Sequence, residues 1–390
     1  MDRVLASEAR CGSSSLPGGT KNFKGKYMAL SVGVVGLPNV GKSTFFNAIT
    51  NAGAAAANYP FCTIDPNKGI VPIRDERLNV LAEMNKSENI IHATIEFVDI
   101  AGLVKGASKG EGLGNKFLSH IQEVSAIAHI VRCFDDPDII HVNGKVNPKE
   151  DIEIINLELI LADIDILSKM IDTASKKAKV DNEYKERLVL MKKIQEALEK
   201  NIPARNLIYD ESEMFLLKTL PLLTLKKVVY VANVDDKNIG KENDFTKIVK
   251  KIAEEAGDEF AIISAKIEEE IAQLSSEERI EYLKELGIPE TGLDVIAHKC
   301  FKLLGLQTFL TAGKKETRAW TIKKGDLAPQ AAGVIHSDFE KGFIRANVVS
   351  YPDYVANNGL VGARAKGLLR QEGKTYVMQE GDIVEFLFNV

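Results

Sequence analysis

The chain has 390 residues, which is too long for one ordinary hydrophobic core, so we expect two or three domains. Hydrophobic residues make up 45% and charged residues 27% of the sequence, and its apolar runs are too short and interrupted to span a membrane. The formal net charge of −5 argues against a protein that coats nucleic acid through charge alone, although a local basic surface remains compatible with it.

The cysteines and the N-terminal segment indicate a reducing, cytoplasmic location. Four cysteines lie far apart, without the spacing of a zinc site or a disulfide framework; they are Cys11, Cys62, Cys133 and Cys300. Residues 1–27 include the stretch SSSLPGG but no apolar segment long enough for a signal peptide. We expect them to be a disordered extension, because Met28 directly precedes the first strand.

Short apolar runs with strand character recur in the first part of the chain, at 30–35, 94–99, 127–134, 228–233 and 260–264. Helical segments separate them, which is typical of a parallel sheet covered by helices on both faces. Residues 28–304 are therefore predicted to form a doubly wound α/β domain. No strand-like run occurs between residues 134 and 228, and apolar residues recur there at helical period. This pattern predicts a helical hairpin inserted at about 148–225. The hairpin is either an amphipathic pair that packs on itself or an arm presented to a partner.

The pattern changes after residue 304. Strand-like runs occur at 309–311, 318–322, 344–349 and 383–390, with turn signals such as Lys324-Gly325-Asp326 between them. Residues 305–390 are therefore predicted to form a second, smaller α+β domain.

The strongest motif is GLPNVGKST at residues 36–44, which satisfies G-x-x-x-x-G-K-[ST] after a predicted strand and before a predicted helix. Its glycines let the backbone curl so that N–H groups face phosphates. Lys42 supplies positive charge to the β and γ phosphates, and the Ser43 hydroxyl can ligate Mg²⁺. The sequence thus predicts a nucleoside triphosphate site built from Asn39, Val40, Gly41, Lys42, Ser43 and Thr44.

Two further segments support this site. The run FVDIAGL places Asp99 at a strand end, where its carboxylate can reach the metal, and Gly102 where a backbone N–H could sense the γ-phosphate. Between the two motifs, Thr63 lies in the interval expected for a residue whose hydroxyl completes the Mg²⁺ shell. The alternative for Thr63 is a loop threonine that bonds its own backbone.

Taken together, these blocks resemble the YchF family of Obg-related P-loop NTPases. The similarity covers nearly all of residues 28–390, including NYPFCTI, FVDIAGLVKGASKGEGLGN, HVNGKVNP, TAGKKETRAWTI, HSDFEKGFIRA and FLFNV. It implies a GTPase-type domain with a helical insertion and a C-terminal TGS domain of ubiquitin-like β-grasp fold. It also implies association with the ribosome, at its large subunit, and a role in translation or stress response.

The base-binding motif departs from that of ordinary GTPases. They read guanine with N-K-x-D, but here Asn233 is followed by Val234, Asp235 and Asp236, so the lysine is missing. The family usually has glutamate at the last position and prefers ATP, whereas this chain keeps an aspartate. ATP is our expectation, with dual use of ATP and GTP as the second choice. Ser264 and Ala265 resemble the backbone segment that lines the base pocket.

The residue that positions the attacking water during nucleotide hydrolysis also differs from that of ordinary GTPases. Leu103 stands where many GTPases have a glutamine, and leucine cannot hydrogen-bond water. The resemblance points to His141 as the substitute, while the alternative is an ordinary loop histidine. Asn39 matches an asparagine that helps to bind K⁺ in potassium-dependent relatives, unless it only shapes the loop.

Three functions therefore remain open from the sequence: a slow ATPase that acts as a ribosome-linked switch, a GTP-specific switch, and a binding module whose turnover is incidental. Neither DNA nor a membrane is an expected partner. A basic surface for RNA could come from the smaller domain, through Lys314, Lys315, Arg318, Lys323, Lys324, Lys341 and Arg345, although a solvated face explains them equally well.

Overall fold

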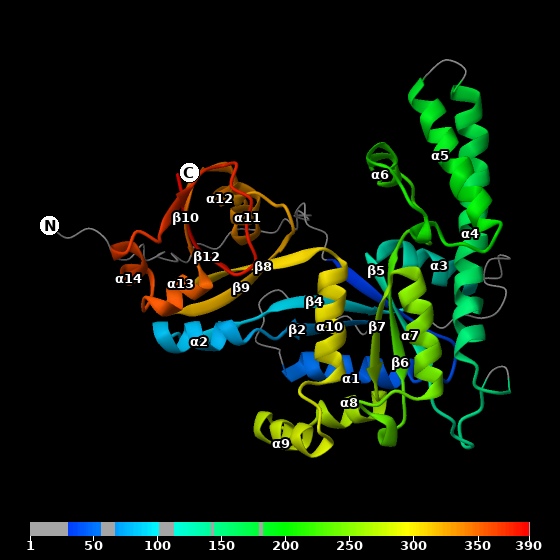
Figure 1. Cartoon of the computed structure of the whole chain (residues 1–390), viewed down its shortest axis with the longest axis horizontal. Coiled ribbons are helices and arrows are strands. Elements are labelled where there is room, and N and C mark those ends of the chain that lie inside the picture. Colours follow the sequence, from blue (N-terminus) through cyan, green and yellow to red (C-terminus); the bar gives the residue numbers. More distant parts are fainter. Residues whose placement is uncertain (1–29, 56–66, 101–112, 142–143, 179–181, 390) are drawn as a thin grey trace, which may run out of the picture.

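The computed structural model describes residues 30–55, 67–100, 113–141, 144–178 and 182–389. The expectations about the extension at 1–27 and about Cys11, Cys62, Thr63, Gly102 and Leu103 lie outside these ranges. Figure 1 shows a larger lobe, from which helices α4 and α5 project, and a smaller lobe formed by the C-terminal part of the chain. Within the described ranges, no helix combines the length and the apolar character needed to cross a bilayer.

The larger lobe is built on a six-stranded sheet with the order β2-β4-β1-β5-β6-β7. Its strands are β1 (Ser31–Val35), β2 (Lys68–Ile73), β4 (Ala93–Asp99), β5 (Ala126–Arg132), β6 (Lys227–Asn233) and β7 (Glu259–Ile263). All residues of β1 and β5 are buried, as expected for central strands covered on both faces. Strands β4, β1, β5, β6 and β7 pair in parallel, which confirms the predicted doubly wound sheet.

Strand β2 corrects the prediction of a purely parallel sheet. It was not predicted, and it pairs antiparallel with β4 at the edge of the sheet. Its sequence, KGIVPI, contains Pro72, which has no N–H to donate to a neighbouring strand. An edge strand tolerates such a residue, because one side of it needs no hydrogen bonds within the sheet.

Helices cover both faces of this sheet. Outside the insertion, the helices of residues 42–303 are α1 (Lys42–Ala55), α2 (Glu76–Asn85), α3 (Leu113–Glu123), α7 (Asp244–Ala256), α8 (Ala265–Ile271), α9 (Ser276–Leu286) and α10 (Gly292–Leu303), with the 3-10 turn η3 (Asp236–Asn238). Helix α2 packs mainly against the sheet of the smaller lobe. Helices α1 and α10 lie on one face, and α7 lies on the other beside the base of α4 (Figure 1). Most buried side chains of the sheet and these helices form one continuous hydrophobic core.

The predicted helical insertion is confirmed as an antiparallel hairpin of α4 (Pro148–Lys177) and α5 (Asn182–Leu198), followed by η2 (Ala204–Asn206) and α6 (Glu211–Leu217). Helix α4 begins after Asn147, whose side chain accepts a hydrogen bond from the Glu150 N–H. The first half of α4 packs into the core of the sheet, through Ile152 and Ile155. Its second half shares a separate core with α5, which includes Leu167. The insertion is therefore an arm anchored at its base.

The smaller lobe confirms the predicted C-terminal α+β fold. Its sheet has the order β11-β10-β12-β8-β9-β3. The C-terminal strands are β8 (Leu306–Ala312), β9 (Glu316–Lys323), β10 (Phe343–Ser350), β11 (Arg370–Glu372) and β12 (Asp382–Phe388). The helices are α11 (Ala328–Ile335), α12 (Ser337–Lys341), α13 (Tyr351–Ala356) and α14 (Leu360–Ala365). Phe309, Ala331 and Val348 lie in the core between the sheet and α11.

The outermost strand of this second sheet comes from the other lobe. Strand β3 (Asn89–Ile91) follows α2 and pairs in parallel with β9. Beside it, the Ser87 hydroxyl donates to the carbonyl oxygen of Gly313 at 2.7 Å, and the Glu88 N–H donates to that of Lys314 at 2.9 Å. The two lobes are therefore joined by main-chain pairing as well as by side-chain contacts.

Candidate nucleotide-binding site

The loop between β1 and α1 has a shape that requires glycine at two positions. Gly41 has a φ of +92°, and a Cβ added there would lie 2.2 Å from Nδ2 of Asn233. A Cβ at Gly36 would lie 2.9 Å from the carbonyl oxygen of Ile130 on β5. Asn39 has a φ of 63°, which asparagine adopts more readily than most residues. The spacing of the two glycines is thus a steric requirement of a loop packed against β5 and β6.

A cavity of about 900 Å³ opens beside this loop, at the carboxyl edge of the parallel sheet. Ligands bind at this edge in open α/β sheets. The predicted residues that line the cavity are Asn39, Gly41, Lys42, Ser43, Thr44, Asn233, Val234, Asp236 and Ala265. Val40 and Ser264 are instead buried behind the lining. Lys266, which continues the predicted base-pocket segment, also lines the cavity, as do side chains that the sequence did not single out, among them Phe134, Ile139 and Lys237.

The phosphate end of the cavity combines a cation with oxygen ligands. Lys42 Nζ donates to Oδ1 of Asp99 at 2.5 Å, and the lysine side chain is only 12% exposed. Asp99 lies beside the loop because it pairs in register with Val34 of β1. The Ser43 hydroxyl is exposed in the first turn of α1, where the helix dipole attracts anions. Hydroxyl and carboxylate oxygens are ligands that suit Mg²⁺, so these residues fit the predicted metal.

Asn233, at the end of β6, joins the two loops that form the cavity. Its Nδ2 donates to the carbonyl oxygen of Val40 at 2.8 Å, and its Oδ1 accepts from the N–H of Ala265 at 2.9 Å. The side chain is buried, so water does not compete for these bonds. One amide therefore fixes the distance between the phosphate loop and the start of α8.

The opposite end of the cavity carries an ion pair that was not predicted. Asp236 Oδ2 accepts from Nζ of Lys266 at 2.7 Å, and its Oδ1 accepts from the Ser264 hydroxyl at 3.2 Å. The hydrogen bond to Asp236, followed by its charge, raises the pKa of Lys266. The side chains of Asp236 and Lys266 are 42% and 67% exposed, so the pair lies at the mouth of the cavity. Both carboxylate oxygens of Asp236 are engaged.

Sequence reasoning also missed Arg132, which is buried at the end of β5. Its guanidinium donates to the carbonyl oxygens of Phe134, Asp136 and Ile139 at 3.1, 3.2 and 3.0 Å. It also lies 4.8 Å from the centre of the Phe134 ring. These contacts curl residues 134–139 along the wall of the cavity. A lone arginine in the apolar run IAHIVRCF was the available signal.

His141 follows this loop and is 6% exposed. Its Nε2 lies 3.0 Å from Oδ2 of Asp151 in the first turn of α4, where burial raises the pKa of the Asp151 carboxyl. His141 is not among the described residues that line the cavity. It is nevertheless connected to the phosphate loop, because Asn39 Nδ2 donates to the carbonyl oxygen of Ile140 at 3.1 Å.

Two family models match the sequence that builds this structure. A model described as "50S ribosome-binding GTPase" matches residues 31–200, which run from β1 into α5 and include the phosphate loop. The model YchF-GTPase_C, described as "Protein of unknown function (DUF933)", matches residues 306–389, which form most of the smaller lobe.

Individual proteins match over nearly the whole chain. A Bacillus subtilis (strain 168) protein named "Ribosome-binding ATPase YchF" is 54% identical over 371 residues, which cover 93% of this chain and 100% of that protein. A protein of the same name from Escherichia coli O157:H7 is 51% identical over 364 residues, with the same two shares. The solved structure of the Schizosaccharomyces pombe YchF GTPase is 40% identical, with a TM-score of 0.84, and covers 92% of this chain and 98% of that chain.

Proposed function

We propose, because this chain belongs to the YchF family, that it is a Mg²⁺-dependent nucleoside triphosphatase that hydrolyses ATP to ADP and phosphate. We further propose that it uses this cycle as a switch on the ribosome, in the cytoplasm. The observation that carries the proposal is the cavity at the carboxyl edge of the sheet, where a loop shaped by glycine presents Lys42 and Ser43. This is the arrangement that holds a nucleoside triphosphate through its phosphates.

The chain's own residues account for phosphate binding. Lys42 and the N–H groups in the first turn of α1 would bind phosphate oxygens. When Lys42 exchanges Asp99 for a phosphate, the carboxylate becomes available on the metal side, so that Ser43 and Asp99 would hold Mg²⁺. Held there, Mg²⁺ would supply positive charge that neutralises the phosphates. Asn39 uses its amide nitrogen on Ile140, which leaves its carbonyl oxygen as the ligand that K⁺ would take.

Adenine is the base that the mouth of the cavity favours. Its N1 acceptor lies next to its N6 donor, whereas guanine presents two neighbouring donors, N1–H and the N2 amino group. Lys266 offers a donor for the adenine N1, and one Asp236 oxygen, which can accept a second hydrogen bond, offers an acceptor for N6 while the ion pair is kept. Guanine would need the Asp236 carboxylate for itself, in competition with a charge-assisted hydrogen bond. Val234 provides no lysine stem to pack over the base.

Replacing Lys266 by methionine tests this base preference. Lys266→Met frees Asp236, so ATP should bind more weakly and GTP more tightly, and the ratio of their affinities should shift by about tenfold toward GTP. Isothermal titration calorimetry with both nucleotides measures the ratio. Lys237→Met is the matched control, because Lys237 lines the same cavity without an ion pair to a described residue. A wild-type protein that binds GTP as tightly as ATP would contradict the proposal and favour a GTPase switch.

Hydrolysis requires a group that positions water, and we propose His141 for this role. Its pairing with Asp151 fixes which ring nitrogen carries the proton, as a carboxylate partner does for catalytic histidines. Its connection to Asn39 through Ile140 offers a route by which the occupied phosphate loop could draw it toward the cavity.

His141→Ala should therefore hydrolyse ATP about 100-fold more slowly while its affinity for ATP stays within about twofold. Single-turnover hydrolysis and equilibrium binding separate the two quantities. Asp151→Asn should slow hydrolysis less, because it loosens the imidazole without removing it. If His141→Ala keeps the wild-type rate and loses only thermal stability, His141 is a structural residue and the proposed role is wrong.

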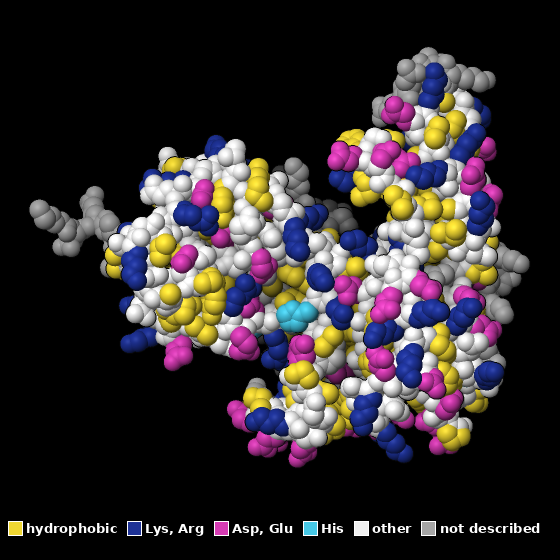
Figure 2. All heavy atoms as spheres, viewed as in Figure 1, with side chains coloured by type: hydrophobic (Ala, Val, Ile, Leu, Met, Phe, Trp, Pro, Cys, Tyr) yellow, Lys and Arg dark blue, Asp and Glu magenta, His cyan; other side chains and the backbone are white. Residues whose placement is uncertain are grey.

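Ribosome binding is proposed from the names of the relatives and from a candidate surface on the smaller lobe. Lys314 and Lys315 are exposed in the turn between β8 and β9, and make no side-chain bond to a described residue. Arg318, by contrast, stacks on Trp320 at 3.8 Å from its ring centre. Figure 2 shows basic and acidic side chains interspersed over this lobe, so the contact would be local and not a broad charged face.

Sedimentation with ribosomes in the presence of ADP or a non-hydrolysable ATP analogue tests this proposal. The bound fraction should differ between the two nucleotides, and Lys314→Ala with Lys315→Ala should weaken the affinity for ribosomes more at low salt than at high salt. Lys366→Ala with Lys374→Ala, which removes two exposed charges elsewhere on the same lobe, is the control. Equal sedimentation in both nucleotide states would contradict a nucleotide-dependent switch.

A further inference from the structure

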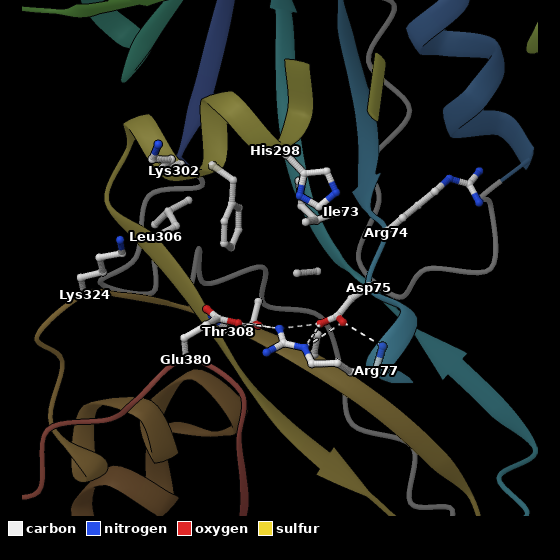
Figure 3. Close-up of a pocket in the computed structure, with 13 residues that line it drawn as sticks. Ile73, Arg74, Asp75, Arg77, His298, Lys302, Leu306, Thr308, Lys324 and Glu380 are labelled. Atoms are coloured by element: carbon white, nitrogen blue, oxygen red, sulfur yellow. Dashed lines mark hydrogen bonds and ion pairs between the residues drawn. The ribbon is translucent and has the colours of Figure 1, made fainter. Parts of the chain in front are cut away.

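A second cavity, separate from the nucleotide site, lies where the two lobes meet (Figure 3). Its volume of about 450 Å³ falls within the range of pockets that bind small molecules. The larger lobe contributes the end of β2, the start of α2 and one side of α10, and the smaller lobe contributes β8, β9 and the turns next to Lys324 and Glu380. We call it the junction cavity.

Apolar side chains form most of its inner surface. Ile73 and Phe301 come from the larger lobe, and Leu306 and Ala319 come from the smaller lobe; each is at most 8% exposed. In Figure 2, hydrophobic surface is visible near the centre of the view, where the lobes meet, with basic side chains around it. Such walls favour a ligand with an apolar or aromatic body, because its burial releases water from both surfaces.

One side of the junction cavity is closed by a network in which both carboxylates are already used. Arg77 Nη2 donates to Asp75 at 2.7 Å and to Glu380. The other oxygen of Glu380 accepts from the Thr308 N–H at 2.8 Å. The hydrogen bonds that Arg77 donates to Asp75 and Glu380 raise the pKa of Arg77 above its ordinary value. Asp75 is therefore committed to Arg77 at the start of α2, and Glu380 to the contact between the lobes, so both are poor ligands for a cation.

The other side carries two lysines, of which Lys302 has an acidic partner and Lys324 has none among the described residues. Figure 3 shows Lys302 and His298 on α10, with Lys324 nearby on the smaller lobe, across the cavity from Arg77. Lys302 is 75% exposed and its acidic neighbour, Glu259, is 3.7 Å away. The N–H of Lys324 donates to the carbonyl oxygen of Gly305, but its side chain forms no hydrogen bond or ion pair with any residue in the described part of the chain. Arg74 is turned away toward Asp294, at 3.2 Å.

We propose that the junction cavity binds a compact organic anion, with an apolar or aromatic body and one phosphate or carboxylate group. The body would lie against Phe301, Leu306 and Ala319, and the anionic group would lie between Lys302 and Lys324. This placement gives the Lys324 ammonium a partner and the Lys302 ammonium a second one beside Glu259, while the two aliphatic stems continue the apolar wall. The proposal does not depend on the identity of the nucleotide that the protein hydrolyses.

The ligand would touch both lobes at once. A molecule that binds only when the lobes are docked stabilises the docked state by mass action. Binding should therefore raise the midpoint of thermal unfolding as the ligand concentration rises, and ligand contacts should come from α10 and from β8 or β9 together.

Phenyl phosphate is a suitable probe, because it combines an aromatic ring with one phosphate. Binding to the full-length protein is measured by calorimetry with and without saturating Mg²⁺ and ADP, which would displace a probe bound at the phosphate loop but not one in the junction cavity. We expect a Kd of about 1 mM or tighter in both conditions. Inorganic phosphate and benzyl alcohol, which each lack one half of the probe, should bind at least about tenfold more weakly.

The double variant Lys302→Met and Lys324→Met locates the site, since methionine keeps an apolar stem but removes the charge. It should weaken phenyl phosphate binding about tenfold or more, whereas the control Lys323→Met, at the exposed end of β9 next to Lys324, should leave it unchanged. Equal unfolding midpoints without the probe show that all variants are folded. No binding in the presence of ADP, or equal loss in the double variant and the control, would overturn the proposal.

Discussion

The side-chain amide of Asn233 is the interaction on which the nucleotide site depends. It reaches from the end of β6 to the phosphate loop on one side and to the start of α8 on the other. Leaving either buried partner unpaired costs about 1–3 kcal/mol, which is a large part of the energy that holds a loop in one shape. Gly41 serves the same contact, because any side chain there would collide with the amide of Asn233. The phosphate end and the base end of the cavity are therefore set by one residue.

The position of the smaller lobe is set by one short stretch of chain that takes part in both sheets. Residues 68–91 leave the first sheet as β2, turn through α2, and enter the second sheet as β3. Arg77 adds an ion pair across the same boundary. Strand β3, which follows α2 of the larger lobe, pairs with β9 of the smaller lobe. This main-chain pairing holds the two lobes together and so determines the shape of the junction cavity. β2 also pairs with β4, with Ile73 opposite Ala93 and Lys68 opposite Val98, so the boundary and the phosphate site lie at opposite ends of this strand pair.

Much of the fold and the phosphate site could be predicted from the sequence, because both depend on local patterns. The phosphate loop was predicted from the spacing of its glycines at 36–41. Strands β1, β5 and β6 were predicted from their short apolar runs. Contacts between distant residues could not be predicted. Strand β3 has too few residues to show a strand pattern, and the proline at position 72 argued against a strand at β2. The pair of Lys266 and Asp236 depends on how the start of α8 is placed against η3, which no local pattern encodes. The family resemblance pointed to His141, but the sequence did not reveal that this side chain is buried against α4.

The most direct test of this account is the affinity of Asn233→Ala for ATP and for GTP in the presence of Mg²⁺, measured by calorimetry beside Asn238→Ala. Among the described residues the Asn238 side chain bonds only Asp235, so its loss should leave both affinities within about twofold of the wild type. Loss of the Asn233 amide should weaken both nucleotides by at least about tenfold, because both loops lose their common support. Wild-type affinity for both nucleotides in folded Asn233→Ala would contradict the central claim.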